Sequence, residues 1–305
     1  TGVTAILPHG GDLFRSRVPA AVDVLNGFGK LAGSTQVEEL GELETPIVLV
    51  NTLAVGRAVE AVVDWTLRQP GADAIRSVNA VVGETNDGRL NDIRQRGLTS
   101  ADVIGAIERS AEGAFALGSV GAGTGTVAFG LKGGIGSSSR IATVEGVGYT
   151  VGVLVQSNYD GVLQIDGVPI GARLRPHAPP APTSGGSIVL VVATDAPLSD
   201  RNLKRLARRA FGGLARTGAA LANGSGDYAV AFSTHRDVRR EHGTSSRRVL
   251  ELANDTLSPL FLAAIEAAEE AIYDSLLGAE PVGDVEALDR PDVRRWLGAP
   301  DAGSR

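Results

Sequence analysis

The 305-residue sequence has no cysteine and no methionine, and aromatic residues make up only 4% of it. Without cysteine the chain forms no disulfide, no thiolate zinc site and no cysteine nucleophile, which is typical of proteins from a reducing compartment. Without methionine Thr1 is not a translation start, so we expect that residues preceding it have been removed.

Positive charge and long apolar runs are also scarce. The formal charge of -6 and the pI of about 5.3 argue against a nucleic-acid partner, which requires a basic surface to neutralise phosphates. No apolar run reaches the roughly 20 residues of a membrane helix, and no signal peptide opens the chain. We therefore expect a cytoplasmic protein whose partners are small molecules or other protein subunits.

The histidines are few and lack a metal-binding pattern. None of the four lies in an H-E-x-x-H motif or at another paired ligand spacing, so we expect no metal and no other cofactor. They are His9, His177, His235 and His242.

Hydrophobic residues nevertheless make up 43% of the chain, enough to bury a large core. Apolar periodicity alternates between the strand period and the helix period along the sequence. Strands are expected at 46–50, 78–82, 150–155, 163–165, 188–193 and 227–232. Helices are expected at 53–67, 100–110 with a cap at Thr99 or Ser100, 200–221, 257–277 and 292–296. This order indicates a mixed α/β fold in which helices cover the outer sides of sheets.

The strongest internal boundary is a proline- and glycine-rich connector at 173–186, which cannot form a regular element. Its last residue, Gly186, precedes Ser187 at the first position of an apolar strand. Gly186 has no side chain to shield its carbonyl and can adopt backbone angles closed to other residues, so the Ser187 hydroxyl could attack it. Hydrolysis of the resulting ester would free the Ser187 α-amine, whose pKa of about 7.7–8 suits a base. The stretch by itself favours the simpler interpretation, a Gly-Gly-Ser turn into the strand.

Six separated segments resemble the DmpA-type family of L-aminopeptidase/D-esterases, which includes the β-peptidyl aminopeptidases. They occur in the family's order at 45–52, 81–88, 121–136, 155–159, 186–198 and 224–234. The most distinctive are Gly83-Glu84-Thr85 with Asp87-Gly88, Gly186-Ser187-Ile188-Val189, and Gly224-Ser225-Gly226-Asp227. The resemblance implies a four-layer αββα sandwich of the DmpA/ornithine-acetyltransferase type, within the α/β (α+β) class.

The resemblance also implies a self-processing serine aminopeptidase or amidase. A single catalytic domain, 1–305, would cut itself into an α chain, 1–186, and a β chain, 187–305. Ser187 would then release N-terminal residues from peptides, amides or esters through an acyl-enzyme. Family precedent favours tetramers of αβ heterodimers, in which the apolar helix at 257–277 is either a core helix or partly a subunit contact.

The resemblance implies roles for three further residues in the reaction at Ser187. Asn158 would donate a hydrogen bond to the oxyanion, although an Asn that ends a strand in a turn has the same local pattern. Ser225 and Asp227, two apart near a strand start, would point to one side and orient the Ser187 amine and hydroxyl. Their alternative is an ordinary Gly-Ser-Gly-Asp turn.

The resemblance assigns substrate contacts as well. Glu84 would hold the ammonium group of a free N-terminus, although an isolated loop glutamate is more often solvated. Asn86 stands at a substrate-binding position where relatives often carry a tyrosine, so that phenol is missing here. Lys132, in the glycine-rich stretch, is a further catalytic candidate. A cation there could support the oxyanion or lower the pKa of the amine, and the alternative is a surface lysine.

Other functions fit the residues less well. The same fold also serves ω-amino amide hydrolases, of nylon-oligomer or pantetheine-like substrates, and acyltransferases, but those mostly use a threonine nucleophile. A nucleotide-binding module could use the glycine-rich stretch 118–136, which misses both G-x-x-x-x-G-K-[ST] and G-x-G-x-x-G. A triad of Ser187, His235 and Asp195 is conceivable, yet nothing in the local sequence favours it.

Overall fold

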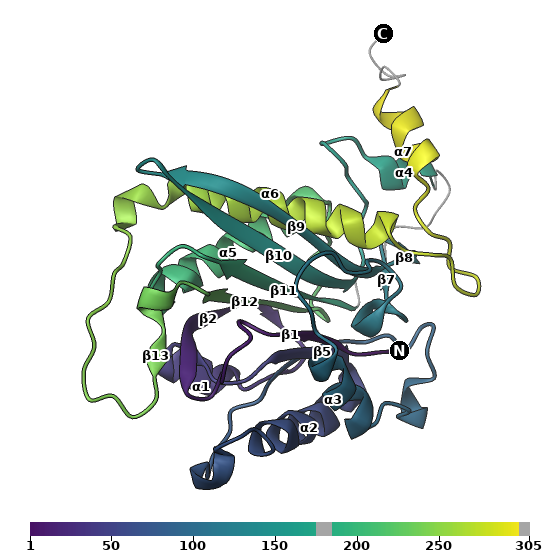
Figure 1. Cartoon of the computed structure of the whole chain (residues 1–305). Coiled ribbons are helices and arrows are strands. Elements are labelled where there is room, and N and C mark those ends of the chain that lie inside the picture. Colours follow the sequence, from purple (N-terminus) through teal and green to yellow (C-terminus); the bar gives the residue numbers. More distant parts are fainter. Residues whose placement is uncertain (175–184, 299–305) are drawn as a thin grey trace.

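The computed structural model describes residues 1–174 and 185–298, and these form two β-sheets that pack face to face (Figure 1). In the smaller sheet β5 and β6 are parallel neighbours and the edge strands run antiparallel to them. Its order is β1 (Thr4–Ile6), β5 (Ile47–Asn51), β6 (Val81–Thr85) and β3 (Leu31–Ala32). The two central strands are continuous apolar runs because both of their faces are covered.

The larger sheet contains the longest strands of the chain. Its order is β13 (Arg240–Glu241), β2 (Ser16–Gly27), β12 (Gly226–Ser233), β11 (Gly186–Thr194), β10 (Val147–Tyr159) and β9 (Gly134–Val144), and β4 (Glu42–Leu43) also pairs with β2. β11 and β12 are parallel and are joined by a crossover through helix α5 (Asp200–Arg216). β10 is antiparallel to both β9 and β11.

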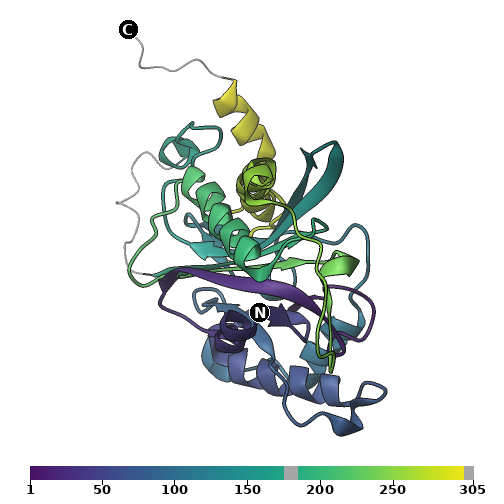
Figure 2. The same ribbon diagram turned by 90° about the vertical axis from the view of Figure 1, so that its left-hand side faces the viewer.

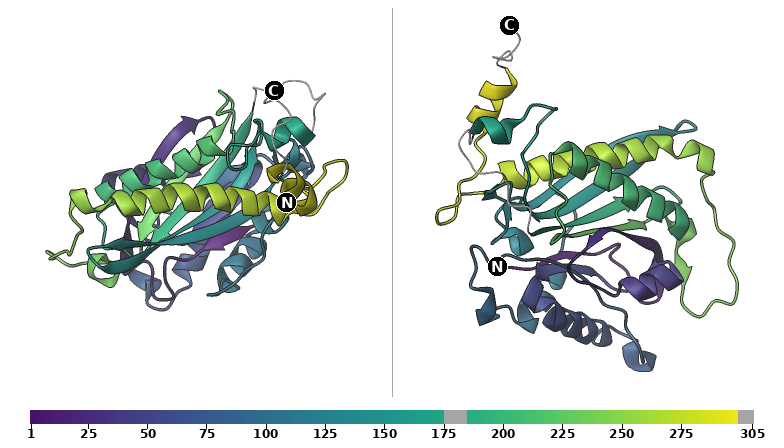
Figure 3. Two further views of the ribbon diagram at one scale, coloured as in Figure 1. Left: turned by 90° about the horizontal axis from the view of Figure 1, so that it is seen from above. Right: turned by 180° about the vertical axis from the view of Figure 1, so that it is seen from behind.

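Helices cover the outer face of each sheet. Helix α5 and helix α6 (Ser258–Leu277) lie on the larger sheet, side by side when the molecule is seen from above (Figure 3). Helix α2 (Val55–Leu67) and helix α3 (Ser100–Glu108) lie on the smaller sheet at the opposite side of the molecule (Figure 2). The order of layers is therefore helix, sheet, sheet, helix, which confirms the expected αββα sandwich.

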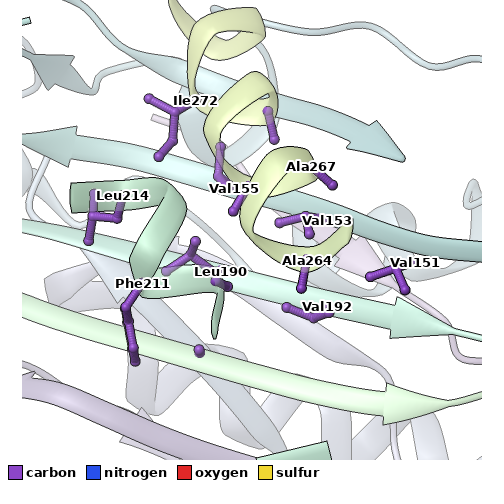
Figure 4. Packing of buried hydrophobic residues seen from close by; sticks show 14 of the residues in the cluster. Val151, Val153, Val155, Leu190, Val192, Phe211, Leu214, Ala264, Ala267 and Ile272 are labelled. Atoms are coloured by element: carbon purple, nitrogen blue, oxygen red, sulfur yellow. The ribbon is translucent and has the colours of Figure 1, made fainter. Parts of the chain in front are cut away.

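Three separate apolar clusters hold these layers together. The first joins α5 and α6 to the larger sheet, with Val153, Leu190 and Phe211 among its members (Figure 4). The second fills the space between the sheets, and the third joins the smaller sheet to α2 and α3. Strands β11 and β12 are covered on both faces, so they form the centre of the molecule.

Helix α6 packs unusually close to β9 because both surfaces are small. Alanines make up much of its buried face, and Gly136 lies beneath it on β9. A Cβ at Gly136 would lie only 1.8 Å from the Ala271 carbonyl oxygen, so only glycine permits this approach. The helix expected at 257–277 is α6, and one of its faces packs in the core.

Several shorter elements complete the described chain. Thr99 caps α3 through a capping box with Asp102, as the sequence predicts. No helix in residues 1–174 and 185–298 is long and apolar enough to cross a membrane. The remaining helices and strands are α1 (Ser34–Leu40), α4 (Ile170–Leu174), α7 (Arg290–Leu297), β7 (Val127–Ala128) and β8 (Leu131–Lys132).

Some sequence expectations about element boundaries are wrong. The strand expected at 78–82 is β6, shifted to Val81–Thr85, and the strand expected at 150–155 continues to Tyr159. The segment 163–165 makes only an isolated bridge, between Ile165 and Val168. Strands β2 and β9 were not expected, because polar and small residues interrupt their apolar pattern. The prolines of the 173–186 connector and His177 lie outside the described residues.

Candidate active site

The Gly186–Ser187 junction is buried at the start of β11. Gly185 and Gly186 have positive φ angles of 141° and 121°, which L side chains rarely adopt. A Cβ on Gly186 would lie 2.9 Å from the Cα of Tyr159, so the position also lacks room for a side chain. The Ser187 hydroxyl donates a hydrogen bond to the carbonyl oxygen of Gly186. The serine oxygen thus lies against the peptide unit that precedes it, and only 4% of Ser187 is exposed.

Asn158 lies beside this serine on the neighbouring strand. It is the direct partner of Ser187 in the β10–β11 pairing, so both side chains point to the same face of the sheet. Its Nδ2 donates to the Asn86 carbonyl at 3.0 Å, and its Oδ1 accepts from the Val127 amide at 3.0 Å. The alternative of an Asn in a turn is wrong, because β10 continues through Asn158 to Tyr159.

Ser225 and Asp227 form a hydrogen-bonded pair on the other side of Ser187. The Ser225 hydroxyl donates to Asp227 Oδ1 at 2.5 Å, and Gly226 between them is the parallel partner of Ser187. Asp227 Oδ2 is buried without a partner in the described parts of the chain. Burial raises the pKa of Asp227, and the Ser225 hydrogen bond opposes this shift.

Strand alternation separates this pair from the serine hydroxyl. Side chains two residues apart in a strand lie on the same face. Ser187 therefore faces the smaller sheet, as Val189 does. Asp227 faces the helices, as Ala229 does. The backbone nitrogen of Ser187 lies in the plane of the sheet between these two faces. Asp227 and the Ser187 side chain therefore lie on opposite faces of the larger sheet.

Glu84 reaches the same end of the sandwich from the smaller sheet. It lies near the end of β6 and is only 2% exposed, so the alternative of a solvated loop carboxylate is wrong. Its Oε1 accepts from the Lys30 amide at 3.0 Å and lies 3.6 Å from the Lys30 ammonium. Its Oε2 accepts from the Thr52 hydroxyl. The carboxylate is thus already paired with one ammonium group.

Asn86 follows β6 directly and uses its side chain locally. Its Oδ1 accepts from the Gly88 amide at 3.0 Å, which stabilises the turn after the strand. Only its backbone carbonyl contacts the predicted site, through Asn158. The side chain at this position therefore shapes a loop here.

Lys132 is fully buried, so the surface-lysine alternative is wrong. Its Nζ donates to the carbonyl oxygens of Gly123 at 2.8 Å and Gly133 at 2.7 Å. Burial lowers the pKa of Lys132 to about 8, although the Asp87 carboxylate opposes this. The glycine-rich stretch thus wraps around a buried cation.

The conceivable serine–histidine–aspartate triad is not formed. Ser187 begins β11 and Asp195 follows its end, so about 26 Å of strand separates them. Asp195 accepts from the Thr150 amide, and the His235 ring accepts from the Asp237 amide. In the described parts of the chain, no three histidine, aspartate or glutamate side chains come together as a metal site.

The fold therefore brings most of the expected residues to one end of the sandwich. The adjoining ends of β6, β10, β11 and β12 carry Glu84, Asn158, Ser187 and the Ser225–Asp227 pair. Sequence reasoning missed Lys30, Thr52 and Tyr228, which also line this region. No local signal marks the first two, whereas Tyr228 directly follows Asp227 in a strand whose alternation could have placed it.

Comparison with known proteins agrees with this architecture. A β-peptidyl aminopeptidase of Sphingosinicella microcystinivorans is 40% identical over 304 residues, which cover 93% of this chain and 75% of that protein. A crystal structure of a Pyrococcus horikoshii protein superposes with a TM-score of 0.90 and 46% identity, covering 97% of this chain and 84% of that one. An L-aminopeptidase D-Ala-esterase/amidase from Ochrobactrum anthropi is described as a variant of the Ntn hydrolase fold. Its structure superposes with a TM-score of 0.90 and 36% identity, covering 97% of this chain and 84% of that one.

The fold and these relatives define a hydrolase, a serine aminopeptidase of the N-terminal-nucleophile type. The chain belongs to peptidase family S58, whose family model matches residues 1–288. The resemblance to the DmpA-type enzymes is thereby confirmed. The nucleotide-binding, acyltransferase and ω-amino amide hydrolase alternatives are not favoured by these comparisons.

Proposed function

We propose that this aminopeptidase first cleaves its own chain between Gly186 and Ser187. The supporting observation is the contact of the Ser187 hydroxyl with the Gly186 carbonyl, beside two glycines whose positive φ angles L side chains rarely adopt. The products would be an α chain, 1–186, and a β chain, 187–305, of one catalytic domain.

The self-cleavage is an acyl shift followed by hydrolysis. Ser187 Oγ attacks the Gly186 carbonyl carbon and the hydroxyl proton passes to the Ser187 nitrogen. The C–N bond then breaks, and an ester joins Gly186 to the Ser187 side chain. Water then cleaves this ester, which leaves a carboxylate on Gly186 and a free α-amine on Ser187. An α-amine ordinarily has a pKa of about 7.7–8, which suits a base that takes the hydroxyl proton in later turnovers.

Turnover of a substrate repeats this chemistry on an N-terminal residue. Ser187 Oγ attacks the substrate carbonyl, and the α-amine passes the hydroxyl proton to the leaving group. Water then hydrolyses the acyl-enzyme and frees Ser187. A carboxamide has two N–H donors, so Asn158 can keep its bond to the Asn86 carbonyl and give the second donor to the oxyanion. The Ser225–Asp227 pair positions the amine, and Lys132 contributes positive charge from behind the glycine-rich loop.

We infer substrates with a free amino group, because Glu84 offers a buried carboxylate at the same end of the sandwich as Ser187. Peptides, amides and esters all have the carbonyl that Ser187 requires. The names of the relatives include a β-peptidyl aminopeptidase and an L-aminopeptidase D-Ala-esterase/amidase, which supports this range. Asn86 directs its side chain into a turn, so no phenol at that position contributes to substrate binding.

We also propose that the processed protein is cytoplasmic and assembles into a tetramer of αβ heterodimers. Exposed apolar side chains support an assembly, since Ile141 and Val147 on the β9–β10 hairpin are 78% and 51% exposed. Light scattering coupled to size exclusion measures the assembly directly.

Denaturing mass spectrometry of the purified protein tests the self-cleavage. We expect two fragments that begin at Thr1 and Ser187 from the wild type, and one intact chain from a Ser187→Ala variant. A single intact wild-type species that still hydrolyses aminoacyl p-nitroanilides would contradict the proposed role of the freed amine. Comparison of α-aminoacyl and β-aminoacyl p-nitroanilides then identifies the preferred acyl group.

A further inference from the structure

Tyr228 lies close to Glu84 and Gly226 and has no role in the reaction described above. Strand alternation directs it between the sheets, on the same face as Ser187 and Val189, and it belongs to the inter-sheet cluster. Only 4% of the surface of Tyr228 is exposed. The ring therefore lies at the same end of the sandwich as the nucleophile.

The ring folds back toward the start of β12. A Cβ on Gly226, the residue paired with Ser187, would lie 3.1 Å from Tyr228 Cε2. A Cβ on Gly29 would lie 3.0 Å from the Tyr228 hydroxyl and 3.1 Å from Glu84 Oε1. The phenol and the carboxylate thus both pack closely against Gly29, where a larger residue would press on both oxygens.

The Tyr228 hydroxyl makes no hydrogen bond within residues 1–174 and 185–298. It is also not one of the fully buried unpaired polar atoms, so its oxygen is open to solvent and can accept a hydrogen bond from a ligand. The neighbouring Glu84 carboxylate attracts a cation, as its contact with the Lys30 ammonium illustrates. Lys30 is 55% exposed on a flexible side chain, so a substrate ammonium can displace it.

We propose that Tyr228 is a substrate-positioning residue, whose phenol oxygen accepts a hydrogen bond from the ammonium group that Glu84 neutralises. This inference rests on the proposed aminopeptidase function and extends it. An ammonium has three N–H donors, so the two oxygens can share it and fix its direction relative to the scissile carbonyl. Burial and the Glu84 charge raise the pKa of Tyr228, which keeps the phenol neutral beside the carboxylate.

Two ester substrates that differ only in the ammonium group test the inference. β-Alanine p-nitrophenyl ester carries the group, and p-nitrophenyl propionate lacks it. For Tyr228→Phe we expect the ratio of kcat/KM for the first ester to that for the second to fall about tenfold, mainly through KM, as for loss of one hydrogen bond. Tyr149→Phe, on the distant part of β10, is the matched control and keeps the wild-type ratio.

Gly29→Ala provides a second variant that retains the phenol. Its methyl group would press on the Tyr228 and Glu84 oxygens and displace them, so we expect the same ratio to fall while the protein remains folded by circular dichroism. An unchanged ratio in Tyr228→Phe would overturn the inference alone. A wild type that does not prefer the amino ester would instead contradict the proposed aminopeptidase function.

Binding of n-propylamine, which has the ammonium group and no scissile carbonyl, makes the test independent of turnover when it is measured by calorimetry. The wild type should bind this amine several-fold more tightly than Tyr228→Phe. Equal affinity of the two proteins would overturn the assignment of Tyr228, whereas no binding to the wild type would contradict the proposed recognition of an ammonium group by this aminopeptidase.

Discussion

Single residues in this protein take their chemistry from burial. Lys132 has no exposed surface, yet it carries an ammonium group that two backbone carbonyls accept from. Glu84 is buried and is paired with Lys30 and Thr52. In both cases the protein holds a charged group where little water can screen it, so a nearby substrate or oxyanion experiences a strong field.

The lowered pKa of Lys132 predicts a pH dependence of stability. The ordinary lysine pKa is 10.5 and that of folded Lys132 is about 8, so between these values the unfolded chain binds a proton that the folded chain lacks. The contribution of Lys132 to the free energy of unfolding therefore increases as pH rises through this window. From pH 7.5 to 9.5 we expect the wild type to gain on the order of 1–2 kcal/mol relative to Lys132→Met.

Urea unfolding of both proteins at the two pH values measures this gain. The comparison is made in a Ser187→Ala background, so that each unfolding reaction involves one covalent chain. Subtracting the variant removes the titration of tyrosines and other lysines. Parallel pH profiles would show that Lys132 titrates normally in the folded protein.

At the scale of elements, the separation between helix and sheet is set by small residues. Alanines on α6 and Gly136 on β9 let the backbones approach until a Cβ at Gly136 would meet the Ala271 carbonyl at 1.8 Å and the Ser275 amide nitrogen at 2.6 Å. Neither contact is a flexible side-chain end. The strand β10, which carries Asn158, is packed between β9 and β11, so this contact supports the site indirectly.

Gly136→Ala should therefore destabilise the molecule strongly. We expect a loss of about 2–3 kcal/mol or more in the free energy of unfolding, because the helix must move away from the sheet. Gly152→Ala on β10 is the control, since the nearest atom to its Cβ is 4.0 Å away, and it should cost much less. Urea unfolding in the Ser187→Ala background distinguishes them, and equal losses would contradict the packing argument.

At the scale of the whole molecule, the proposed cut lies inside a continuous sheet. β10 belongs to the α chain and pairs with β11 of the β chain from Val151 opposite Thr194 to Asn158 opposite Ser187. β2 of the α chain pairs with β12 on the other side. The apolar clusters also combine residues from both sides of the cut.

We therefore expect the two fragments to remain associated after cleavage. Native mass spectrometry should give particles that contain both chains in equal number, while denaturing conditions separate them. Separation of the fragments under native conditions would show that the covalent connection is needed for the fold. A Ser187→Ala protein should have the same quaternary mass as the processed wild type.

Much of the fold is readable from the sequence. The apolar run 188–193 predicted β11, the helical period predicted α2, α5 and α6, and the Thr99 cap predicted the start of α3. The segments at 81–88, 155–159, 186–198 and 224–234 led to the family and to the residues proposed for catalysis. The strands β2 and β9 were not predicted, because serine, asparagine and glycine interrupt their apolar alternation. Pairing with β12 and β10 stabilises them instead.

By itself the sequence determined the alternation of elements and the chemical groups available, among them Ser187, Asn158, Glu84 and Lys132. The tertiary structure alone decided their environments. It placed Glu84 in a buried strand, Lys132 in the interior, and Asn158 opposite Ser187. Local sequence does not determine these environments. Burial depends on which distant layer covers a residue, and pairing depends on the register of strands far apart in the chain.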